Sequence, residues 1–177
     1  MTMETLKLDL RDQIRDVPDF PKPGILFKDI TPLLMDPSAL RLCIEKLCSP
    51  WYSKEPDVII GIEARGFIFG AAMAVSMGVP FVPIRKPGKL PWKTRSASYA
   101  LEYGEDTIEI HEDAVAPGQR VLLVDDLLAT GGTMAAAIRL VRELGGKVVE
   151  ALFVIELKDL HGRDKLPDIP IRSLLTY

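Results

Sequence analysis

The chain has 177 residues, the length of one ordinary globular domain. Apolar residues make up 47% and charged residues 27%, a balance that excludes an intrinsically disordered chain. The formal net charge is −3, whereas domains that bind nucleic acid over a broad surface are usually basic, so no nucleic-acid partner is expected. Two cysteines are too few for a disulfide framework, and we expect them to be buried reduced thiols. The charged N-terminus lacks the apolar run of a signal peptide, so we expect a cytoplasmic protein.

One stretch has nearly the length of a membrane span. Gly66 to Ile84 is 19 residues without a charge, close to what crosses a bilayer. Pro80 and Pro83 interrupt this stretch, and Gly78 stands just before them. The sequence therefore predicts a short buried helix over Phe67–Met77 followed by a strand, and no membrane partner.

The rest of the chain alternates between short apolar runs and helical spacing. Residues 4–15 are loosely helical, residues 19–32 are broken by prolines and fit a loop or an extended segment, and Asp36 precedes Pro37 as a helix cap. A helix is expected over 132–144, and strands are expected over 58–62, 81–84, 107–111, 121–124 and 148–157.

Strands that alternate with helices in this way are typical of parallel βαβ units. We therefore predict a single α/β domain over residues 1–177, with a central, mainly parallel twisted sheet flanked by helices. In open sheets of this class, functional residues follow the carboxyl ends of the strands. The segments that follow each apolar run are the candidate site.

Residues 121–133, VLLVDDLLATGGT, are the most informative segment. Asp125 and Asp126 follow a buried run, and a turn of small residues then leads into a helix. Free backbone N–H groups and the helix dipole at such a turn bind phosphate, and its glycines let the backbone come close. The acids cannot face that phosphate, so they would bind hydroxyl groups or a metal nearby, which fits a sugar phosphate. The loop residues are Ala129, Thr130, Gly131, Gly132 and Thr133.

Two common nucleotide-binding motifs are missing. The sequence has neither GxxxxGK[ST] nor GxGxxG. A nucleoside triphosphatase or a dinucleotide-binding protein would need one of them.

The segment VLLVDDLLATGGT resembles the 5-phosphoribosyl-1-pyrophosphate binding motif of the type I phosphoribosyltransferases. Four other segments narrow the resemblance to the adenine-specific branch: DFPKPGILFKDITPL at 19–33, EARGFIFG at 63–70, RKPGKLP at 85–91 and YALEYG at 99–104. The resemblance runs from about residue 14 to the end, and the tail is similar to the family's C-terminal hairpin. It implies the type I phosphoribosyltransferase fold, with a small hood over about residues 15–35 and a flexible lid loop over about residues 85–104.

The resemblance implies an enzyme of purine salvage. It would transfer the 5-phosphoribosyl group from 5-phosphoribosyl 1-pyrophosphate to N9 of adenine, forming AMP and pyrophosphate. It would use Mg²⁺ held mainly through substrate and water, with no direct protein ligand, and it would be a homodimer. Two alternatives stay open: a phosphoribosyltransferase for another purine such as xanthine or guanine, and a non-catalytic regulator that senses phosphoribosyl pyrophosphate and binds DNA.

The resemblance also assigns roles around the sugar. Asp125 and Asp126 would hold the ribose hydroxyls, and the loop 129–133 would hold the 5′-phosphate. Glu63, Ala64 and Arg65 would bind pyrophosphate, on a backbone that turns through a non-proline cis peptide, and Arg65 would also be catalytic. The alternative for Arg65 is an ion pair with Glu63.

The adenine pocket is expected in the hood and beside the acids. Phe27 would stack on the base, the backbones of Ile25 and Lys28 would read its edge, and Leu127 would cover its other face. The alternative for Phe27 is ordinary core packing.

Charge is unevenly distributed between residues 85 and 113. Residues 85–95 hold five positive charges and no acid, and residues 102–113 hold six acids and no Lys or Arg. We expect a lid that excludes water, in which Lys86 and Lys89 meet pyrophosphate. A solvated charged hairpin and a nucleic-acid patch are the alternatives.

Three further residues are assigned to this region. Arg85 and Tyr103 would belong to the lid. Glu102 is the candidate acid or base near N7 of the purine, with an ordinary acidic loop residue as the alternative.

Overall fold

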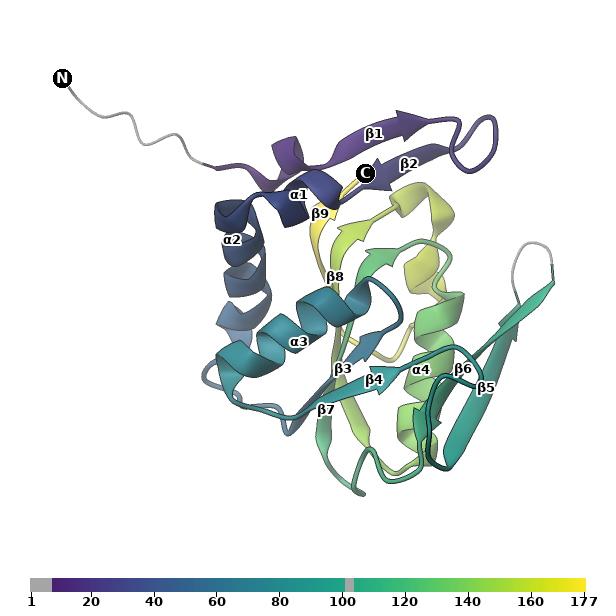
Figure 1. Ribbon diagram of the computed structural model, residues 1–177. Helices are drawn as coiled ribbons and strands as arrows, with labels where there is room; N and C mark the ends of the chain where they lie inside the picture. The colour runs from purple at the N-terminus through teal and green to yellow at the C-terminus, as the bar shows by residue number, and fades with distance from the viewer. Residues whose placement is uncertain (1–7, 101–103) are drawn as a thin grey trace. The chain divides into compact units, whose positions relative to one another are not determined.

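The computed structural model describes residues 8–100 and 104–177 (Figure 1). The chain divides into two compact units, Met1–Lys46 and Leu47–Tyr177, which are described separately below. The single domain with a hood and a lid stays a prediction.

The first unit contains a small antiparallel hairpin. It consists of β1 (Arg15–Pro18) and β2 (Leu26–Asp29), where the sequence predicted only a loop or an extended segment. The turn is closed by Asp19, whose Oδ1 accepts a hydrogen bond of 2.7 Å from the backbone N–H of Gly24. These strands are short and contain no fully buried residue, so the sequence shows no hydrophobic alternation there.

Three helical segments accompany this hairpin. They are the 3-10 turn η1 (Leu10–Gln13), α1 (Thr31–Met35) and α2 (Pro37–Cys48), which continues into the second unit. The expected cap of α2 is confirmed, since Asp36 Oδ1 accepts hydrogen bonds from the backbone of Ser38 and Ala39. The helical prediction for residues 4–15 is wrong within residues 8–15, which form only one turn before β1 begins.

The second unit is built on a five-stranded parallel sheet, which confirms the predicted α/β class. The strand order is β4-β3-β7-β8-β9. The strands are β3 (Val58–Ile62), β4 (Phe81–Ile84), β7 (Arg120–Leu128), β8 (Lys147–Glu156) and β9 (Ile171–Thr176). Helices α3 (Gly66–Met77) and α4 (Gly132–Glu143) cover opposite faces of this sheet (Figure 1).

The uncharged stretch of 19 residues is divided between α3 and β4, as predicted. No helix within the described ranges has the length and apolar character needed to cross a bilayer. Close packing of α3 depends on two glycines, because a Cβ on Gly61 or on Gly70 would lie 2.9 Å from the ring of Phe81.

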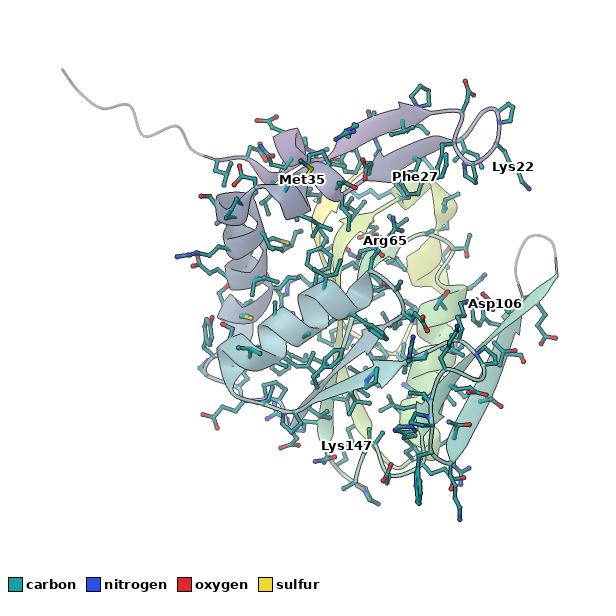
Figure 2. The ribbon with its side chains drawn as sticks, viewed as in Figure 1. Lys22, Phe27, Met35, Arg65, Asp106 and Lys147 are labelled. Carbon is teal, nitrogen blue, oxygen red and sulfur yellow. The ribbon has the colours of Figure 1, made fainter. Side chains whose placement is uncertain are left out.

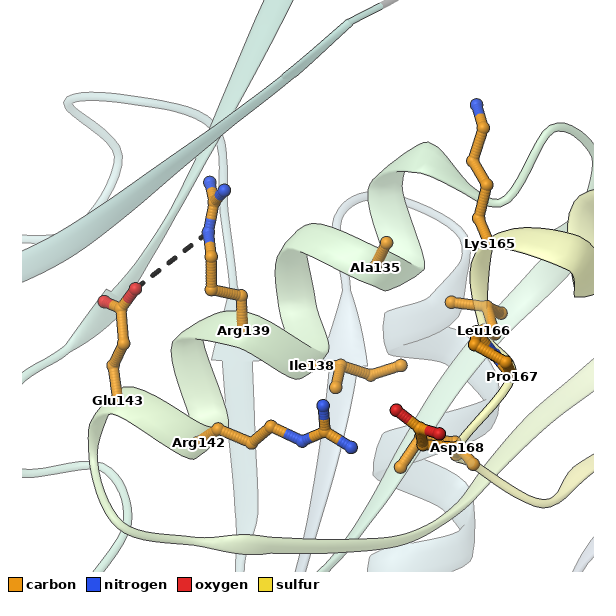
Figure 3. A pocket seen from close by; sticks show the side chains of 10 residues that line it. Ala135, Ile138, Arg139, Arg142, Glu143, Lys165, Leu166, Pro167 and Asp168 are labelled. Atoms are coloured by element: carbon orange, nitrogen blue, oxygen red, sulfur yellow. Dashed lines mark ion pairs between the residues drawn. The ribbon is translucent and has the colours of Figure 1, made fainter.

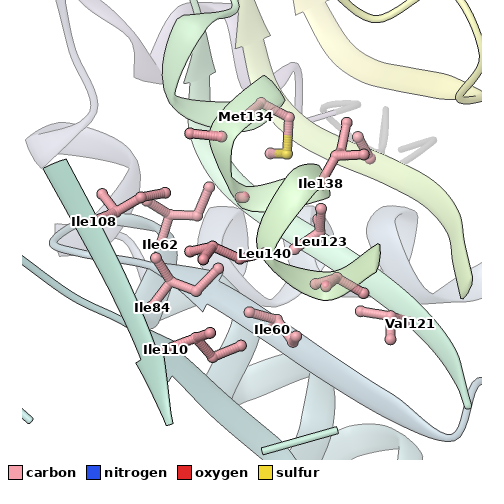
Figure 4. Packing of buried hydrophobic residues seen from close by; sticks show 14 of the residues in the cluster. Ile60, Ile62, Ile84, Ile108, Ile110, Val121, Leu123, Met134, Ile138 and Leu140 are labelled. Atoms are coloured by element: carbon pink, nitrogen blue, oxygen red, sulfur yellow. The ribbon is translucent and has the colours of Figure 1, made fainter. Parts of the chain in front are cut away.

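The face covered by α4 holds the main hydrophobic core (Figure 4). The core brings together side chains from β3, β4, β7, α4 and the strand β6 (Glu105–His111). Among them are Ile60, Ile62, Ile84, Ile108, Ile110, Leu123, Met134 and Leu140. Cys43 and Cys48 are both buried and unpaired, as expected.

The predicted lid region is partly a second hairpin. Strands β5 (Thr94–Ala100) and β6 (Glu105–His111) pair antiparallel, and the alternation expected over residues 107–111 is confirmed. Ile108 and Ile110 are 1% and 0% exposed, so β6 is anchored in the core. Flexibility of the lid stays a prediction.

The C-terminal tail forms a strand of the sheet. Residues 171–176 pair in parallel with β8, so the expected hairpin is wrong. The link from β8 contains only the 3-10 turns η3 (Lys158–Leu160) and η4 (Gly162–Lys165), so the strand-helix-strand rhythm that predicted the other strands is missing. Another 3-10 turn, η2 (Ser49–Trp51), precedes β3.

The anchoring of β6 leads to a stability prediction. Replacing Ile110 by Ala deletes buried carbon atoms between the hairpin and the sheet, and we expect the free energy of unfolding to fall by about 2–5 kcal/mol. Urea denaturation measures this change. The exposed neighbour Glu112→Ala is the control and is expected to change the free energy by less than about 0.5 kcal/mol. Equal effects of the two substitutions would contradict the anchoring.

Candidate active site

The segments that follow β3, β4 and β7 meet at one edge of the sheet, because these three strands are parallel neighbours. Arg65 lies at this edge, and Lys147, at the start of β8, marks the opposite end of the sheet (Figure 2). The Nε atom of Arg65 is 2.9 Å from Oδ2 of Asp126. Two segments that the sequence singled out separately are therefore joined by an ion pair.

The two adjacent acids lie within the last part of β7, further inside the sheet than the sequence predicted. Asp126 is only 5% exposed. Burial raises the pKa of both carboxyls, the charge of Asp126 adds to this effect on Asp125, and Arg65 acts in the opposite direction on both. The pair is therefore a place where additional positive charge or hydroxyl donors are favourable.

The loop after these acids, residues 129–133, consists of small residues and leads into the start of a helix. Gly131 has a φ of 78°, and α4 begins at Gly132, so the unpaired N–H groups of its first turn are at the loop. A small cavity of about 70 Å³ is lined by residues 127–134 together with Asp125 and Phe153. This geometry suits a small anion such as a phosphate group.

The loop packs against a segment that sequence reasoning did not connect with the site. A Cβ on Gly131 would collide with the carbonyl oxygen of Gly162, and a Cβ on Gly162 would collide with that of Ala129. Backbone therefore touches backbone here, and only glycines fit.

A buried carboxylate anchors this segment. Oε1 and Oε2 of Glu156 each lie 2.6 Å from a guanidinium nitrogen of Arg163, and Oε2 also accepts a hydrogen bond of 2.7 Å from Ser173. The hydrogen bonds from Arg163 lower the pKa of Glu156 despite its burial. Glu156 and Arg163 therefore hold η4 in place beside the loop.

The turn after β3 has the backbone that the family resemblance implied. The peptide bond between Glu63 and Ala64 is cis. The carboxylate of Glu63 accepts hydrogen bonds from Arg85 Nη2 at 3.0 Å and from the backbone N–H of Lys86 at 3.0 Å. Glu63 thus joins the turn after β3 to the segment after β4, while Arg65 pairs with Asp126.

The charged segment after β4 is partly neutralised from within the chain. Lys86 Nζ forms an ion pair with Asp106 of β6. The backbone carbonyl of Lys89 accepts a hydrogen bond of 3.1 Å from Arg85 Nη1. Glu102 and Tyr103 lie outside the described residues.

The expected adenine residues fall in both units. Phe27 packs edge-to-face on Phe20 with ring centroids 5.1 Å apart, and Lys28 Nζ donates to Asp16 Oδ1 at 2.6 Å. Ile25 is 43% exposed. Leu127 belongs to β7 in the second unit, so a shared pocket stays a prediction.

A separate groove of about 500 Å³ lies between α4 and residues 165–169 (Figure 3). Its floor includes Ile138 and Leu166, and Arg139 pairs with Glu143 at its rim. It contains none of the site residues expected from the sequence. Within the described ranges, no three His, Cys, Asp or Glu side chains gather as a metal site.

Comparisons with known proteins agree on one family. The model of the phosphoribosyl transferase domain matches residues 39–174. A relative from Bradyrhizobium sp. (strain ORS 278), named adenine phosphoribosyltransferase, is 55% identical over 175 residues, which are 98% of this chain and 98% of that protein.

Solved structures give the same result. The crystal structure of adenine phosphoribosyltransferase from Thermoanaerobacter pseudethanolicus has a TM-score of 0.92 and 54% identity, and the match covers 95% of this chain and 98% of that chain. The Saccharomyces cerevisiae enzyme, complexed with D-2,5-dideoxy-2,5-imino-altritol 1,6-bisphosphate and adenine, has a TM-score of 0.89 and 42% identity, and the match covers 94% of this chain and 96% of that chain.

The raised pKa of Asp125 leads to a prediction about stability and pH. Above the pKa of an unfolded Asp, about 3.9, the folded state binds more protons than the unfolded state, so folding loses stability as pH rises toward the raised pKa. Asp125→Asn avoids this loss. We expect its free energy of unfolding to exceed that of the parent by on the order of 1 kcal/mol at pH 7.5.

Urea denaturation at pH 4 and at pH 7.5 measures this difference. The advantage of Asp125→Asn should be largely absent at pH 4 and present at pH 7.5. An advantage that is the same at both values, or a variant that is less stable at pH 7.5, would contradict the role of buried charge.

Proposed function

The chain belongs to the phosphoribosyltransferase family, with adenine phosphoribosyltransferases as its relatives over nearly its full length, and we propose that it makes AMP from adenine and 5-phosphoribosyl 1-pyrophosphate. The reaction transfers the 5-phosphoribosyl group to N9 of the base and releases pyrophosphate. The observation that supports it best is the Arg65–Asp126 ion pair of 2.9 Å. This pair links the turn after β3 to β7, the strand that leads into a loop with a cavity of about 70 Å³.

The sugar phosphate would lie along the end of β7. The N–H groups of the loop 129–133 would bind the 5′-phosphate, where the helix dipole favours negative charge. Asp125 and Asp126 would accept hydrogen bonds from the ribose 2′- and 3′-hydroxyls. Since the pKa of each carboxyl is raised by burial, such donors stabilise the charged form.

The pyrophosphate would leave toward the turn after β3. Backbone groups of Glu63 and Ala64 and the side chains of Arg65, Lys86 and Lys89 would bind it. The transition state resembles an oxocarbenium ion with a departing polyanion, so positioning and stabilisation of leaving-group charge would account for most of the catalysis. Arg65 is proposed as a catalytic residue for this reason.

The base would be held by Ile25, Phe27 and Lys28 of the first unit and by Leu127 of the second. Glu102 would act as acid or base near N7, which tunes electron density at N9. Arg85 and Tyr103 would belong to the lid that excludes water. The similarity of this chain over 94% of its length to the Saccharomyces cerevisiae enzyme, which was solved with adenine, supports adenine as the base.

Magnesium is part of the proposal. The buried acids Asp125 and Asp126 fit a cation held through water, because burial raises the pKa of both carboxyls and Arg65 supplies one positive charge for the two of them. When bound with the substrate, Mg²⁺ would neutralise part of the pyrophosphate charge. We also propose a homodimer that works in the cytoplasm, a reducing compartment in which the two buried, unpaired cysteines are stable.

A panel of bases tests the function. Purified protein is mixed with Mg²⁺, phosphoribosyl pyrophosphate and adenine, guanine, hypoxanthine or xanthine, and nucleotide formation is followed. We expect AMP to form at least about 100-fold faster than any other nucleotide, a difference of about 2.7 kcal/mol. Turnover of guanine or xanthine but not adenine would favour the first alternative. Binding of phosphoribosyl pyrophosphate and DNA with no turnover would favour the regulator.

The backbone contact of the loop leads to a prediction about substrate binding. Gly162→Ala places a methyl group against the carbonyl oxygen of Ala129, so we expect the KM for phosphoribosyl pyrophosphate to rise about tenfold, with a smaller change for adenine. Steady-state kinetics measures both values.

Gly118→Ala is the matched control. This glycine has a φ of 84° with open space around it, in the turn before β7. Its replacement should lower the melting temperature without a comparable change in KM. If Gly162→Ala lowered stability and left KM unchanged, the segment would have no role in shaping the loop.

A further inference from the structure

Lys86 has partners in the β5–β6 hairpin that the proposed mechanism does not use. Its ammonium group forms an ion pair with Asp106 Oδ2 and lies 3.4 Å from the hydroxyl of Tyr99. That hydroxyl donates a hydrogen bond of 3.1 Å to the same carboxylate oxygen. Tyr99 and Asp106 face each other across the two strands, so the hairpin register itself builds the cluster.

The cluster lies between the two loops that are proposed to bind anions. The backbone N–H of Lys86 donates to the carboxylate of Glu63, in the turn after β3. On the other side, the ring of Tyr99 packs against the start of α4, where a Cβ on Gly132 would lie 3.2 Å from Cδ2 of Tyr99. The backbone of Lys86 is therefore bound to the turn after β3, and Tyr99, beside its amine, packs against the start of α4.

The carboxylate of Asp106 is a well-built acceptor. Besides Lys86 and Tyr99, the backbone N–H of Thr107 donates to it at 2.8 Å. The hydrogen bond from Lys86 lowers the pKa of Asp106. Burial opposes the charge of Lys86, but the hydrogen bond to Asp106 and the proximity of Tyr99 outweigh it and raise the pKa of the amine. Both groups are charged at neutral pH, with side chains 40% and 31% exposed.

We propose that Asp106 and Tyr99 are positioning residues that hold Lys86 until pyrophosphate arrives, and that Lys86 exchanges Asp106 for an oxygen of the pyrophosphate group. The inference rests on the proposed function, because it takes Lys86 as a pyrophosphate ligand. Breaking the ion pair costs free energy that the new contact must offset. Asp106 therefore weakens pyrophosphate binding, and its removal should make this binding tighter. A merely structural role of Asp106 predicts the opposite, weaker binding after its removal.

The test uses Asp106→Asn, which removes the charge and leaves an oxygen for Tyr99 and Thr107. Titration calorimetry with Mg²⁺ and pyrophosphate measures the Kd. We expect the Kd to fall about two- to fivefold, the range of a partly exposed ion pair, while the Kd for AMP is unchanged. Tyr99→Phe keeps the ring against Gly132 and loses the hydroxyl, so it should shift the Kd in the same direction by less.

A double-variant cycle shows whether Asp106 acts through Lys86. In a Lys86→Met background, Asp106→Asn is expected to leave the pyrophosphate Kd unchanged. Ser98→Ala is the matched control, since it removes the cross-strand hydrogen bond of 2.9 Å to Thr107 at the neighbouring position of the hairpin. It should alter neither Kd.

Weaker pyrophosphate binding by Asp106→Asn, or the same change with and without Lys86, would overturn the proposal. Turnover of adenine by the parent protein is measured first, and this separates the two ways to fail. A parent that makes AMP while Asp106→Asn shows no tightening refutes the exchange alone. A parent that neither turns over adenine nor binds pyrophosphate refutes the proposed function, and the exchange with it.

Discussion

Two adjacent carboxylates on an interior strand are the constraint on which the site depends. Asp125 and Asp126 lie at the end of β7, where burial makes ionisation costly, and Arg65 supplies the opposing charge at 2.9 Å. Removing one partner of such a pair leaves an uncompensated charge in the interior. The ion pair between Arg65 and Asp126 therefore fixes the turn after β3 to β7. It also fixes the position at which the loop after β7 begins.

The loop at residues 129–133 consists of small residues, so it has few side chains with which to hold its own shape. Support comes instead from segments distant in the sequence. Gly162 packs on one side, fixed through the pair formed by Glu156 and Arg163, and the ring of Tyr99 packs against Gly132 on the other. Glycine is thus required at Gly131 and Gly162, where the supporting backbone approaches the loop.

The sequence predicts those parts of the fold and the site whose pattern lies within one segment of the chain. Buried strands such as β3 and β7 contain continuous apolar runs, α3 lies in the uncharged stretch, and α4 has apolar residues at helical spacing. The motif at 121–133 marks the loop. Strands β1, β2 and β9 lack that signal, because they are short or only partly buried. The partners of Arg65 and Lys86 lie 61 and 20 residues away in the sequence. Strand order and hairpin register bring these residues together in space. Such pairings become visible only in three dimensions.

The ion pairs at this edge of the sheet set a condition on the pyrophosphate binding that we propose there. Arg65, Arg85 and Lys86 each face a carboxylate of the chain, namely Asp126, Glu63 and Asp106. An anion that enters must compete with these carboxylates. A single charge gains little from that exchange, whereas a pyrophosphate group can contact several cations at once and offset the cost of each broken pair. Internal pairing therefore favours highly charged ligands over monoanions, at the expense of absolute affinity.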